Sequence, residues 1–391
     1  MAWRTMAVRD QRVRFVVRAN QGEESFSALC EEFDISRPTG YRWLRRYHDQ
    51  GVSGIEERSR RPHGSPERTP AAIEQQVVGM RRQRPDWGAR KLQALLERQG
   101  TKLATRTVHR ILVRHDLVRE DDSHRSAPRR FEREAPNQLW QMDFKSPKGW
   151  QRSVGPLSVL DDHSRYVVAL AATGSTQGEA VRERLESAFL ECGLPEEMLM
   201  DHGIPWWNAQ APSGWTRLSV WLMKQGIRCW FSGYGHPQTQ GKVERFHGAL
   251  EMARRRRGLP SAEQHQAWLD EFREEYNHLR PHEALGGQTP ASAWYPSTRR
   301  YHPHPPEWDY GTGAEVQRLG ANGQLKLQRR WWQVSEALAY EPVQLVRVEE
   351  RVLVYYCQSL LREIDLADQR STPVERWSQP SNCKGCGGNA V

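Results

Sequence analysis

The stretch 139–144 reads LWQMDF, a short apolar run that closes on Asp143. A second run, EMLMD at 197–201, closes on Asp201 in the same way, and GKVERFH at 241–247 carries Glu244 in a helix-like pattern. Short apolar runs bounded by polar residues are typical of buried β-strands. The sequence therefore places two aspartates at strand ends and a glutamate at a helix start, where side chains distant in sequence can converge.

Three converging carboxylates repel one another unless cations lie between their oxygens. Hard oxygen ligands suit Mg²⁺, and Mn²⁺ is an alternative. Two such ions in one site can activate an attacking oxygen and stabilise a leaving one during phosphoryl transfer. We therefore predict that Asp143, Asp201 and Glu244 are both the catalytic residues and the metal ligands of a polynucleotidyl transferase that uses two ions per active site.

Charge is unevenly distributed along the 391 residues, whose net charge is +9. Residues 1–136 hold 28 Lys and Arg against 19 Asp and Glu, whereas residues 137–391 hold 29 of each. A basic excess confined to the N-terminal third indicates that this part binds a polyanion. Charge alone is a weak indication, because many basic proteins are simply soluble.

Cysteine content and hydropathy predict a cytoplasmic protein without a membrane partner. Six cysteines in a chain of this length do not form a framework of secreted disulfides. We expect no membrane-spanning helix and no signal peptide, because no apolar stretch is long enough and the N-terminus MAWRTMAVRDQR lacks an apolar core.

Residues 8–48 predict three short helices within a first helix-turn-helix domain, 1–52. Ser36 is the expected N-cap of the third helix, which runs to about Tyr47. A helix of this length and charge fits the major groove of DNA. A small helical bundle with a solvated basic face is the alternative. The candidate DNA-binding residues of this helix are Arg37, Arg42, Arg45 and Arg46.

A second helix-turn-helix domain is expected at 73–118, between linkers at 53–72 and 119–136. Leucines at helical spacing predict one helix, and a second helix has Thr105 as a candidate cap. Its candidate DNA-binding residues recur every four positions, although they could form a solvated face instead. The residues expected to face inward are Leu92, Leu95, Leu96, Val108, Ile111 and Leu112, and the basic stripe consists of Arg106, Arg110 and Arg114.

From residue 137 to 300 the pattern changes to three strands, helix, strand, helix, strand, helix. This order predicts a mixed α/β sheet with helices packed on both faces. Asp161 and Asp162 follow a strand as well, and we assign them to a hairpin turn rather than to metal binding.

These residues resemble the integrase-type, ribonuclease-H-like core of DDE transposases, in particular those of the IS481 and IS3 groups of bacterial insertion sequences. The resemblance rests on NQLWQMDF, LDDHSRY, MDHG, GHPQTQGKVERFHG and YNHLRPHEALGGQTPASAW. The last two stretches, in this order, are highly specific. With the helix-turn-helix units, the resemblance covers roughly residues 10–300.

The resemblance implies that Asp143, Asp201 and Glu244 are the catalytic triad. It implies a metal-dependent reaction that cleaves DNA at the ends of an insertion sequence and joins the freed 3′-hydroxyl to target DNA. The implied partners are double-stranded DNA, namely terminal repeats and target, and further copies of the chain in a homo-oligomer. Lys242 and Arg254 are candidate DNA contacts beside the site.

Two features depart from the family pattern. The interval between Asp201 and Glu244 is longer than usual, and we assign the surplus to a loop, IPWWNAQAPSGW at 204–215, that can bulge without moving the helix that bears Glu244. The position two helical turns after the catalytic glutamate is often basic, but here it is Glu251. Either the basic cluster 254–257 replaces that contact, or DNA binding is weakened.

Three further residues have open roles. His247, one turn beyond Glu244, either orients DNA or water or is a packed surface histidine. Arg280 and His282 lie in the stretch that resembles the region after the catalytic core, and we expect them to be structural.

The C-terminal region predicts a linker at 301–312, a small β-barrel at 313–368 and a flexible tail at 369–391. Arg329, Arg330, Trp331 and Trp332 could stack on nucleic acid, but core tryptophans with solvated arginines fit equally well. The tail carries a single CxxC pair, Cys383 and Cys386, which is a weak indication of zinc.

The main alternative function is a catalytically inactive, helix-turn-helix DNA-binding regulator derived from a transposase, and Glu251 favours it. A nuclease that cleaves without joining is a third possibility. A hydrolase directed at RNA is a fourth, and the two helix-turn-helix units speak against it.

Overall fold

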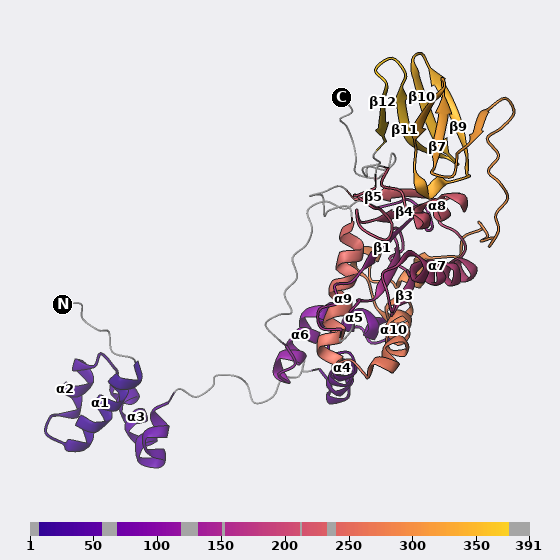
Figure 1. The fold of residues 1–391 in the computed structure, drawn as a ribbon. Coiled ribbons are helices and arrows are strands. Elements are labelled where there is room, and N and C mark those ends of the chain that lie inside the picture. The colour runs from indigo at the N-terminus through magenta and orange to yellow at the C-terminus, as the bar shows by residue number, and fades with distance from the viewer. Residues whose placement is uncertain are drawn as a thin grey trace. The chain divides into compact units, whose positions relative to one another are not determined.

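The computed structural model describes residues 8–56, 69–118, 132–150, 153–211, 213–232 and 240–374. The chain separates into two compact units, residues 1–70 and residues 71–391 (Figure 1). Cys383 and Cys386 lie outside the described residues, as do 57–68 and 119–131 in the expected linkers.

The first unit is a bundle of three helices, as the sequence predicted. They are α1 (Val8–Gln21), α2 (Phe26–Glu32) and α3 (Arg37–Gln50), followed by a 3-10 turn, η1 (Gly51–Ile55). Ser36 takes the N-cap position of α3, although its hydroxyl lies 3.0 Å from that of Thr39 rather than bonding a backbone N–H. The turn η1 completes the core, because Ile55 is buried with Phe15.

Close helix packing in this unit depends on Gly40 of α3. A Cβ at this position would lie 2.8 Å from Cys30 Sγ and 2.9 Å from the ring of Phe15. Contacts this short are not tolerated in a packed core, so only glycine fits here. Gly40 thereby sets how α3 crosses the two helices beneath it.

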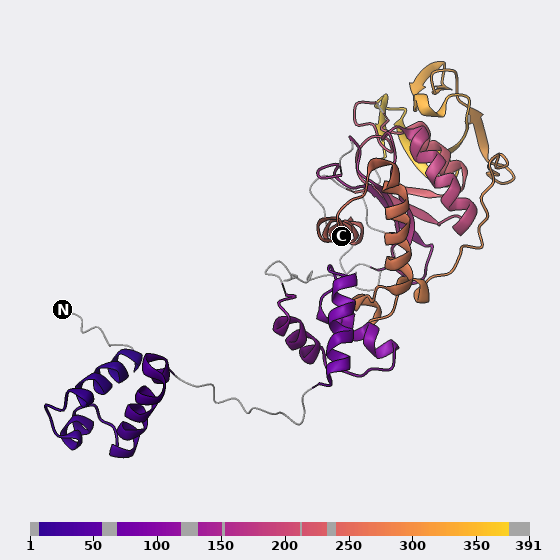
Figure 2. The same ribbon diagram turned by 90° about the horizontal axis from the view of Figure 1, so that it is seen from below.

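The second unit begins with three helices, α4 (Ala71–Gln83), α5 (Ala89–Arg98) and α6 (Thr105–Arg114). All six residues expected to face inward are buried in one cluster with Val77 and Trp87. Thr105 is not the cap of α6: Ala104 holds the N-cap position and Thr105 is the first helical residue. In Figure 2 these three purple helices lie beside the orange helices that follow the central sheet.

The central sheet of the second unit is mixed, as predicted, with the strand order β3-β2-β1-β4-β5. β2 pairs antiparallel with both β1 and β3, while β1–β4 and β4–β5 are parallel pairs. The strands are β1 (Leu139–Phe144), β2 (Leu157–Asp161), β3 (Val167–Ala171), β4 (Glu197–Met200) and β5 (Arg228–Phe231).

Helices cover both faces of this sheet, so successive side chains, which point to opposite faces, are buried along β2, β3 and β4. Trp140 and Met142 of β1 pack into a cluster with α7 (Gly178–Cys192) and α8 (Arg217–Lys224). A second cluster joins Leu160, Val167 and Leu170 to α9 (Gly241–Arg257) and α10 (His265–Glu274). A π-helical turn, η5 (Glu275–Leu279), continues α10.

The C-terminal region is not a closed barrel, so that prediction was wrong. It forms a five-stranded antiparallel sheet in the order β12-β11-β10-β9-β6, and a separate hairpin of β7 and β8. Within the described residues the edge strands β6 and β12 each pair on one side only. The strands are β6 (Glu315–Arg318), β7 (Gln324–Leu327), β8 (Arg330–Gln333), β9 (Pro342–Val348), β10 (Arg351–Tyr356), β11 (Ser359–Asp365) and β12 (Arg370–Pro373).

The sheet stays open because it buries its apolar face against neighbouring elements instead of closing on itself. Val343, Val352 and Ile364 share one core cluster with the β7–β8 hairpin and with the central domain. Lys224 at the end of α8 pairs with Glu341 at 2.6 Å, which fixes the join. No described helix is long and apolar enough to span a membrane.

Candidate active site

The register of the two central parallel strands sets the positions of both aspartates. Leu139 of β1 lies opposite Glu197 of β4, and Gln141 lies opposite Leu199. Continuing this register by two residues places Asp143 beside Asp201. Because the two strands are parallel, both carboxylates emerge at the same edge of the sheet, as the sequence predicted.

Glu244 lies in the first turn of α9, and its neighbours hold that helix start against β1 and β2. The backbone N–H of Val243 donates to Oε1 of Gln141 at 3.3 Å, and the Gln141 amide donates to Asp162 at 2.8 Å. Lys242 Nζ lies 2.6 Å from Asp162. The fully buried Gln141, two residues before Asp143, thus ties the strand of one acid to the helix of another.

Asp143 experiences the charge of both other acids. Burial is the largest cause that raises the pKa of Asp143, and together with the negative charges of Asp201 and Glu244 it takes that pKa to about 7. Among the described residues, no lysine or arginine forms an ion pair with any of the three acids. Asp143 thus lies near enough to Asp201 and Glu244 to be affected by both charges, and no described lysine or arginine neutralises the three acids by an ion pair.

The ligand chemistry of this site suits a hard cation, because the three groups offer only carboxylate oxygens. The side chains are not gathered into a finished metal cage. Within the described residues, no three His, Cys, Asp or Glu side chains lie close enough together to hold an ion as they stand. The fit rests on the donor set and on the shared negative charge around Asp143.

His247, for which the sequence left open a role in orienting DNA or water and a packed position on the surface, is packed in the interior at 7% exposure. Its Nε2 lies 3.0 Å from the hydroxyl of Ser158, and its Nδ1 lies 3.7 Å from Asp143 Oδ2, beyond hydrogen-bonding distance. Burial lowers the pKa of His247 to about 3, so the ring is neutral near neutral pH. Ser158 is the β2 partner of Asp143 in the sheet.

Asp161 is the last residue of β2 and Asp162 is the first of the turn that leads to β3, so only Asp162 lies within the predicted turn, and both are fully buried. Asp161 accepts hydrogen bonds from the backbone N–H groups of Asn137 and Ser164, both at 2.7 Å. Burial raises the pKa of Asp161. These two aspartates hold the turn and its neighbours together, whereas Asp143 and Asp201 face the sheet edge.

Lys242 was predicted to contact DNA, and the structure places it in an internal ion pair. Its side chain is 14% exposed and pairs with the buried Asp162. Burial lowers the pKa of Lys242 to about 8, although the Asp162 charge acts in the opposite direction. A DNA contact by Lys242 stays a prediction, and holding the start of α9 is a role that the sequence did not indicate.

The arginines of α3 differ in their surroundings. Arg37, Arg42 and Arg45 are exposed. Arg46 instead stacks over the Trp43 ring at 4.5 Å and donates to the carbonyl of Glu56 at 2.7 Å. The exposed three remain available for the predicted DNA contacts, while Arg46 also stabilises the bundle.

The three arginines of the basic stripe on α6 also differ in their surroundings. Arg106 and Arg110 are exposed. Arg114 forms an ion pair with Glu74 of α4, whose side chain is 7% exposed. The pair joins the first and last helices of this region, so Arg114 has a structural role beside its predicted one.

The four arginines at the end of α9 all bond to protein groups. Arg254 and Arg255 bind the carboxylate of Glu251 at 2.6 and 2.7 Å, and Arg254 also donates to the carbonyl of Gly149 at 2.9 Å. Hydrogen bonds from Arg254, followed by those from Arg255, hold the pKa of Glu251 at about 2. Arg256 donates to the carbonyl of Pro85 at 2.8 Å.

Arg257 forms an ion pair with Asp86, a second buried acid, and the sequence did not indicate this pair. Asp86, between α4 and α5, is fully buried and pairs with Arg257 at 2.5 Å and with Arg280 at 2.9 Å. Arg257 also contacts Glu275 of the π-helical turn at 2.7 Å. The predicted structural role of Arg280 is therefore specific: together with Arg257, it fastens α4–α6 to the central domain.

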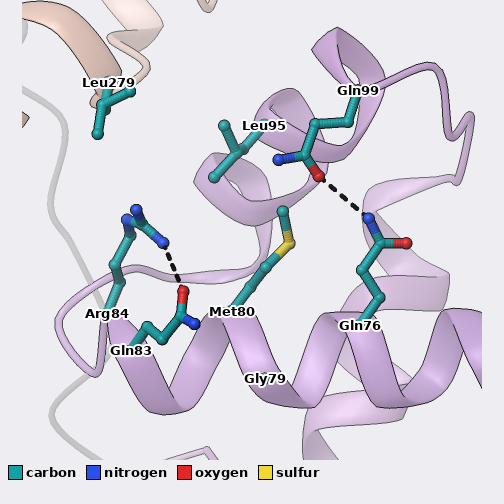
Figure 3. A pocket seen from close by; sticks show the side chains of 8 residues that line it. All are labelled: Gln76, Gly79, Met80, Gln83, Arg84, Leu95, Gln99 and Leu279. Carbon is teal, nitrogen blue, oxygen red and sulfur yellow. Dashed lines mark hydrogen bonds between the residues drawn. The ribbon is translucent and has the colours of Figure 1, made fainter.

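A shallow hollow of about 440 Å³ lies beside this junction (Figure 3). Gln76 and Gln99 bond each other across it at 3.0 Å, and Gln83 accepts a hydrogen bond from Arg84 at 3.2 Å. None of its eight lining residues is acidic, and none belongs to the predicted catalytic set. This hollow is therefore separate from the candidate active site.

Comparison with known proteins supports the predicted class, in which helix-turn-helix domains are joined to an integrase-type core. Integrase core domain models match residues 133–237 and 225–290. A helix-turn-helix domain model matches residues 11–63, and a homeodomain-like domain model matches residues 39–112. The chain thus carries an integrase core preceded by helix-turn-helix domains, which confirms the recognition made from the sequence.

Three of its curated relatives are proteins of mobile elements. An uncharacterized 31.7 kDa protein of insertion element IS407 from Burkholderia multivorans is 26% identical over 55% of this chain and 78% of the relative. An uncharacterized 39.2 kDa protein of insertion element IS476 from Xanthomonas euvesicatoria is 27% identical over 58% and 66%. The transposase for transposon Tn552 from Staphylococcus aureus is 24% identical over 58% of this chain and 52% of its own length.

The solved structures that this chain resembles include the following two. The HTLV-2 integrase catalytic core domain in complex with magnesium is 16% identical, covers 41% of this chain and 98% of its own, and superposes with a TM-score of 0.32. A simian T-cell lymphotropic virus intasome in complex with the PP2A regulatory subunit B56 gamma is 18% identical, covers 78% and 100%, and has a TM-score of 0.35.

Proposed function

We propose that this protein is a DDE transposase that cuts and joins DNA at the ends of an insertion sequence, with Asp143, Asp201 and Glu244 as its catalytic acids. The observation that carries the proposal is the shared site. It is supported by the register of the two strands that end at Asp143 and Asp201, and by the charges of Asp201 and Glu244, which both act on Asp143.

Asp143 and Asp201 would hold divalent cations from adjacent strands, and Glu244 would hold them from α9. Mg²⁺ or Mn²⁺, two ions per site, would supply the positive charge that activates an attacking oxygen and stabilises a leaving oxygen. The fixed part of the site is the pair of strand ends. Gln141 and the Lys242–Asp162 pair keep the start of α9 next to them.

The proposed partner is double-stranded DNA, both the terminal repeats and the target. The exposed Arg37, Arg42 and Arg45 on α3 would read or hold one segment, and Arg106 and Arg110 on α6 another. Two modules on one chain raise each other's local concentration on DNA. We also propose a homo-oligomer on DNA, since two element ends must be held together, and a cytoplasmic location.

The test is a joining assay with the full chain. Labelled DNA carrying the terminal sequences of the element that encodes the protein is incubated with a target plasmid and Mg²⁺ or Mn²⁺. We expect strand transfer by the wild type and none by Asp201→Asn. The matched control is Asp270→Asn, which removes the same charge from an exposed position on α10 and should join normally.

Other outcomes separate the alternatives. Specific binding to the ends without nicking or joining would favour the regulator, and cleavage without joining of pre-cut ends would favour a nuclease. Preference for an RNA–DNA hybrid over duplex DNA would favour the RNA-directed hydrolase. Equal joining by Asp201→Asn and the wild type would reject the proposed catalytic triad.

A further inference from the structure

The segment 204–215, which the sequence assigned to a loop, packs its three tryptophans into the core. Trp206, Trp207 and Trp215 are only 1%, 6% and 4% exposed. Gly214 packs directly on Trp207, since a Cβ on Gly214 would lie 1.9 Å from that ring. The extra residues between Asp201 and Glu244 therefore form a packed aromatic turn rather than a loose loop.

Trp206 is the member of this turn that is fixed from several sides. Its backbone N–H donates to the carbonyl of Gly203 at 3.1 Å, and its own carbonyl accepts from the hydroxyl of Thr216 at 3.2 Å. Thr216 is the N-cap of α8 and shares a reciprocal capping box with Ser219. The position of Trp206 is thus determined by the start of a core helix.

The indole ring of Trp206 contacts Asp201 and Phe144, the residue that follows Asp143. Its N–H donates to Oδ1 of Asp201. Its face stacks on Phe144, with the ring centroids 5.5 Å apart and the planes 22° apart, and Phe144 directly follows Asp143 on β1. Since an indole N–H can only donate, it bonds a carboxylate oxygen without competing for a cation.

We propose that Trp206 is a positioning residue for the active site: its N–H orients the Asp201 carboxylate, and its ring holds the end of β1 that carries Asp143. This inference rests on the proposed function, because it assigns Trp206 a part in the same cation-binding site. A hydrogen bond to a charged carboxylate is among the stronger ones, and partners that orient ligating carboxylates tune the affinity of metal sites.

The direct test measures cation binding without DNA or turnover. Mn²⁺ is titrated calorimetrically into the full chain, comparing the wild type with Trp206→Phe, which keeps an aromatic ring but lacks the N–H. We expect Mn²⁺ to bind Trp206→Phe about 10- to 100-fold more weakly. The matched control is Trp207→Phe, a buried neighbour that packs on Phe231 at 4.8 Å and should change the affinity less than about threefold.

A second variant removes the hydrogen bond while keeping the shape. Benzothienylalanine at position 206, introduced by codon suppression, replaces the indole N–H by sulfur in a ring of nearly the same size. It should weaken Mn²⁺ binding as Trp206→Phe does, while its thermal unfolding temperature in EDTA falls less than that of Trp206→Phe, because the ring packing is kept. This variant separates loss of the donor from loss of packing, even if Trp206→Phe unfolds.

A double-mutant cycle supplies a readout that needs neither metal nor DNA. The cycle of Trp206→Phe and Asp201→Ala, followed by urea unfolding in EDTA, should show coupling: the two changes together destabilise less than their sum. Additive effects would overturn the proposal, as would unchanged Mn²⁺ affinity in both position-206 variants or an equal loss in Trp207→Phe.

The outcomes for Trp206 and for the transposase function are distinguishable. If the wild type binds Mn²⁺ with the predicted dependence on Trp206 but joins no DNA, the function fails and the positioning role stands. If joining requires Asp201 but proceeds at the wild-type rate in both position-206 variants, the positioning role fails and the function stands.

Discussion

Asp143 and Asp86 are two largely buried aspartates of the same unit, and their pKa values move in opposite directions. Burial alone would raise both. Around Asp143, the carboxylates of Asp201 and Glu244 add to that rise and take the pKa to about 7. Around Asp86, the guanidinium groups of Arg280 and Arg257 outweigh burial and lower the pKa.

The opposite pKa shifts indicate different roles for Asp86 and Asp143. Asp86 has its cations within the fold, so it stabilises a junction between helices and leaves little charge for a ligand. Asp143 shares its site with other acids and has no arginine or lysine ion pair among the described residues. An uncompensated acidic centre at a sheet edge is suited to a cation from solution.

The largest effect is expected for Asp143→Asn. Joining should fall by about 1,000-fold or more, because losing several kcal/mol of transition-state stabilisation costs roughly tenfold in rate for every 1.4 kcal/mol. Stability in EDTA at pH 8 should be equal or higher, since the variant removes a charge that the fold disfavours. Joining rates and urea unfolding measure the two effects. A variant that joins normally would remove Asp143 from the catalytic set.

Asp86→Asn should have the opposite effect: it should lower the stability of the fold and leave the cation site unchanged. It leaves two buried guanidinium groups without their carboxylate, and removing one partner of a buried ion pair costs about 3–5 kcal/mol. Urea unfolding of the full chain, following the transition of residues 71–391, measures the loss. Mn²⁺ affinity should stay at the wild-type value. Destabilisation below about 1 kcal/mol would mean that this junction is not held by the Asp86 centre.

The two aspartates should also act in opposite pH ranges. The folded-state pKa of Asp86 is lowered, so its stabilisation is present above its unfolded pKa of about 3.9 and is lost as pH falls further. The folded-state pKa of Asp143 is raised, so its contribution is present below about 3.9 and is lost as pH rises through about 7.

Unfolding midpoints of the wild type and both variants between about pH 3 and pH 8 test this difference. The gap between the wild type and Asp86→Asn should narrow at the acid end. The gap between the wild type and Asp143→Asn should grow toward pH 8, in favour of the variant. If the unfolding midpoints of all three proteins changed with pH in parallel, the opposite pKa shifts given to Asp86 and Asp143 would be contradicted.

The smallest effect is expected for Glu251→Gln. Its bonds with Arg254 and Arg255 lie near the surface of α9, and such pairs contribute about 1 kcal/mol or less. Stability should therefore fall only slightly, while DNA binding should rise, because two arginines are freed. Thermal unfolding and DNA titration measure these changes. Weaker DNA binding by this variant would show that the Glu251 network supports the DNA contact rather than restraining it.

Much of the central fold could be predicted from local pattern. The strand 139–144 was placed at its observed bounds, and Asp143, Asp201 and Glu244 were placed at strand and helix ends. This worked because the apolar runs are short, bounded and buried on both faces, so that sequence period and structure agree.

Long-range pairing could not be predicted in the same way. Two ion pairs, Lys242 with Asp162 and Arg257 with Asp86, join residues that are far apart in sequence. The positions of charged residues along the chain do not show which of them will pair. The open C-terminal sheet was missed because strand lengths do not reveal whether edges meet. The tryptophans at 206, 207 and 215 were read as a loop from Gly and Pro content, although three buried aromatic residues indicate packing.

The central claim is that the acidic edge formed by Asp143, Asp201 and Glu244 binds the cations of a joining reaction, whereas Asp86 does not. The most direct measurement is calorimetric titration of Mn²⁺ into the full chain and into four variants: Asp143→Asn, Asp201→Asn, Glu244→Gln and Asp86→Asn. We predict that binding is lost or strongly weakened in the first three and unchanged in the fourth. Wild-type affinity in Asp143→Asn and Asp201→Asn, or a loss confined to Asp86→Asn, would contradict this account.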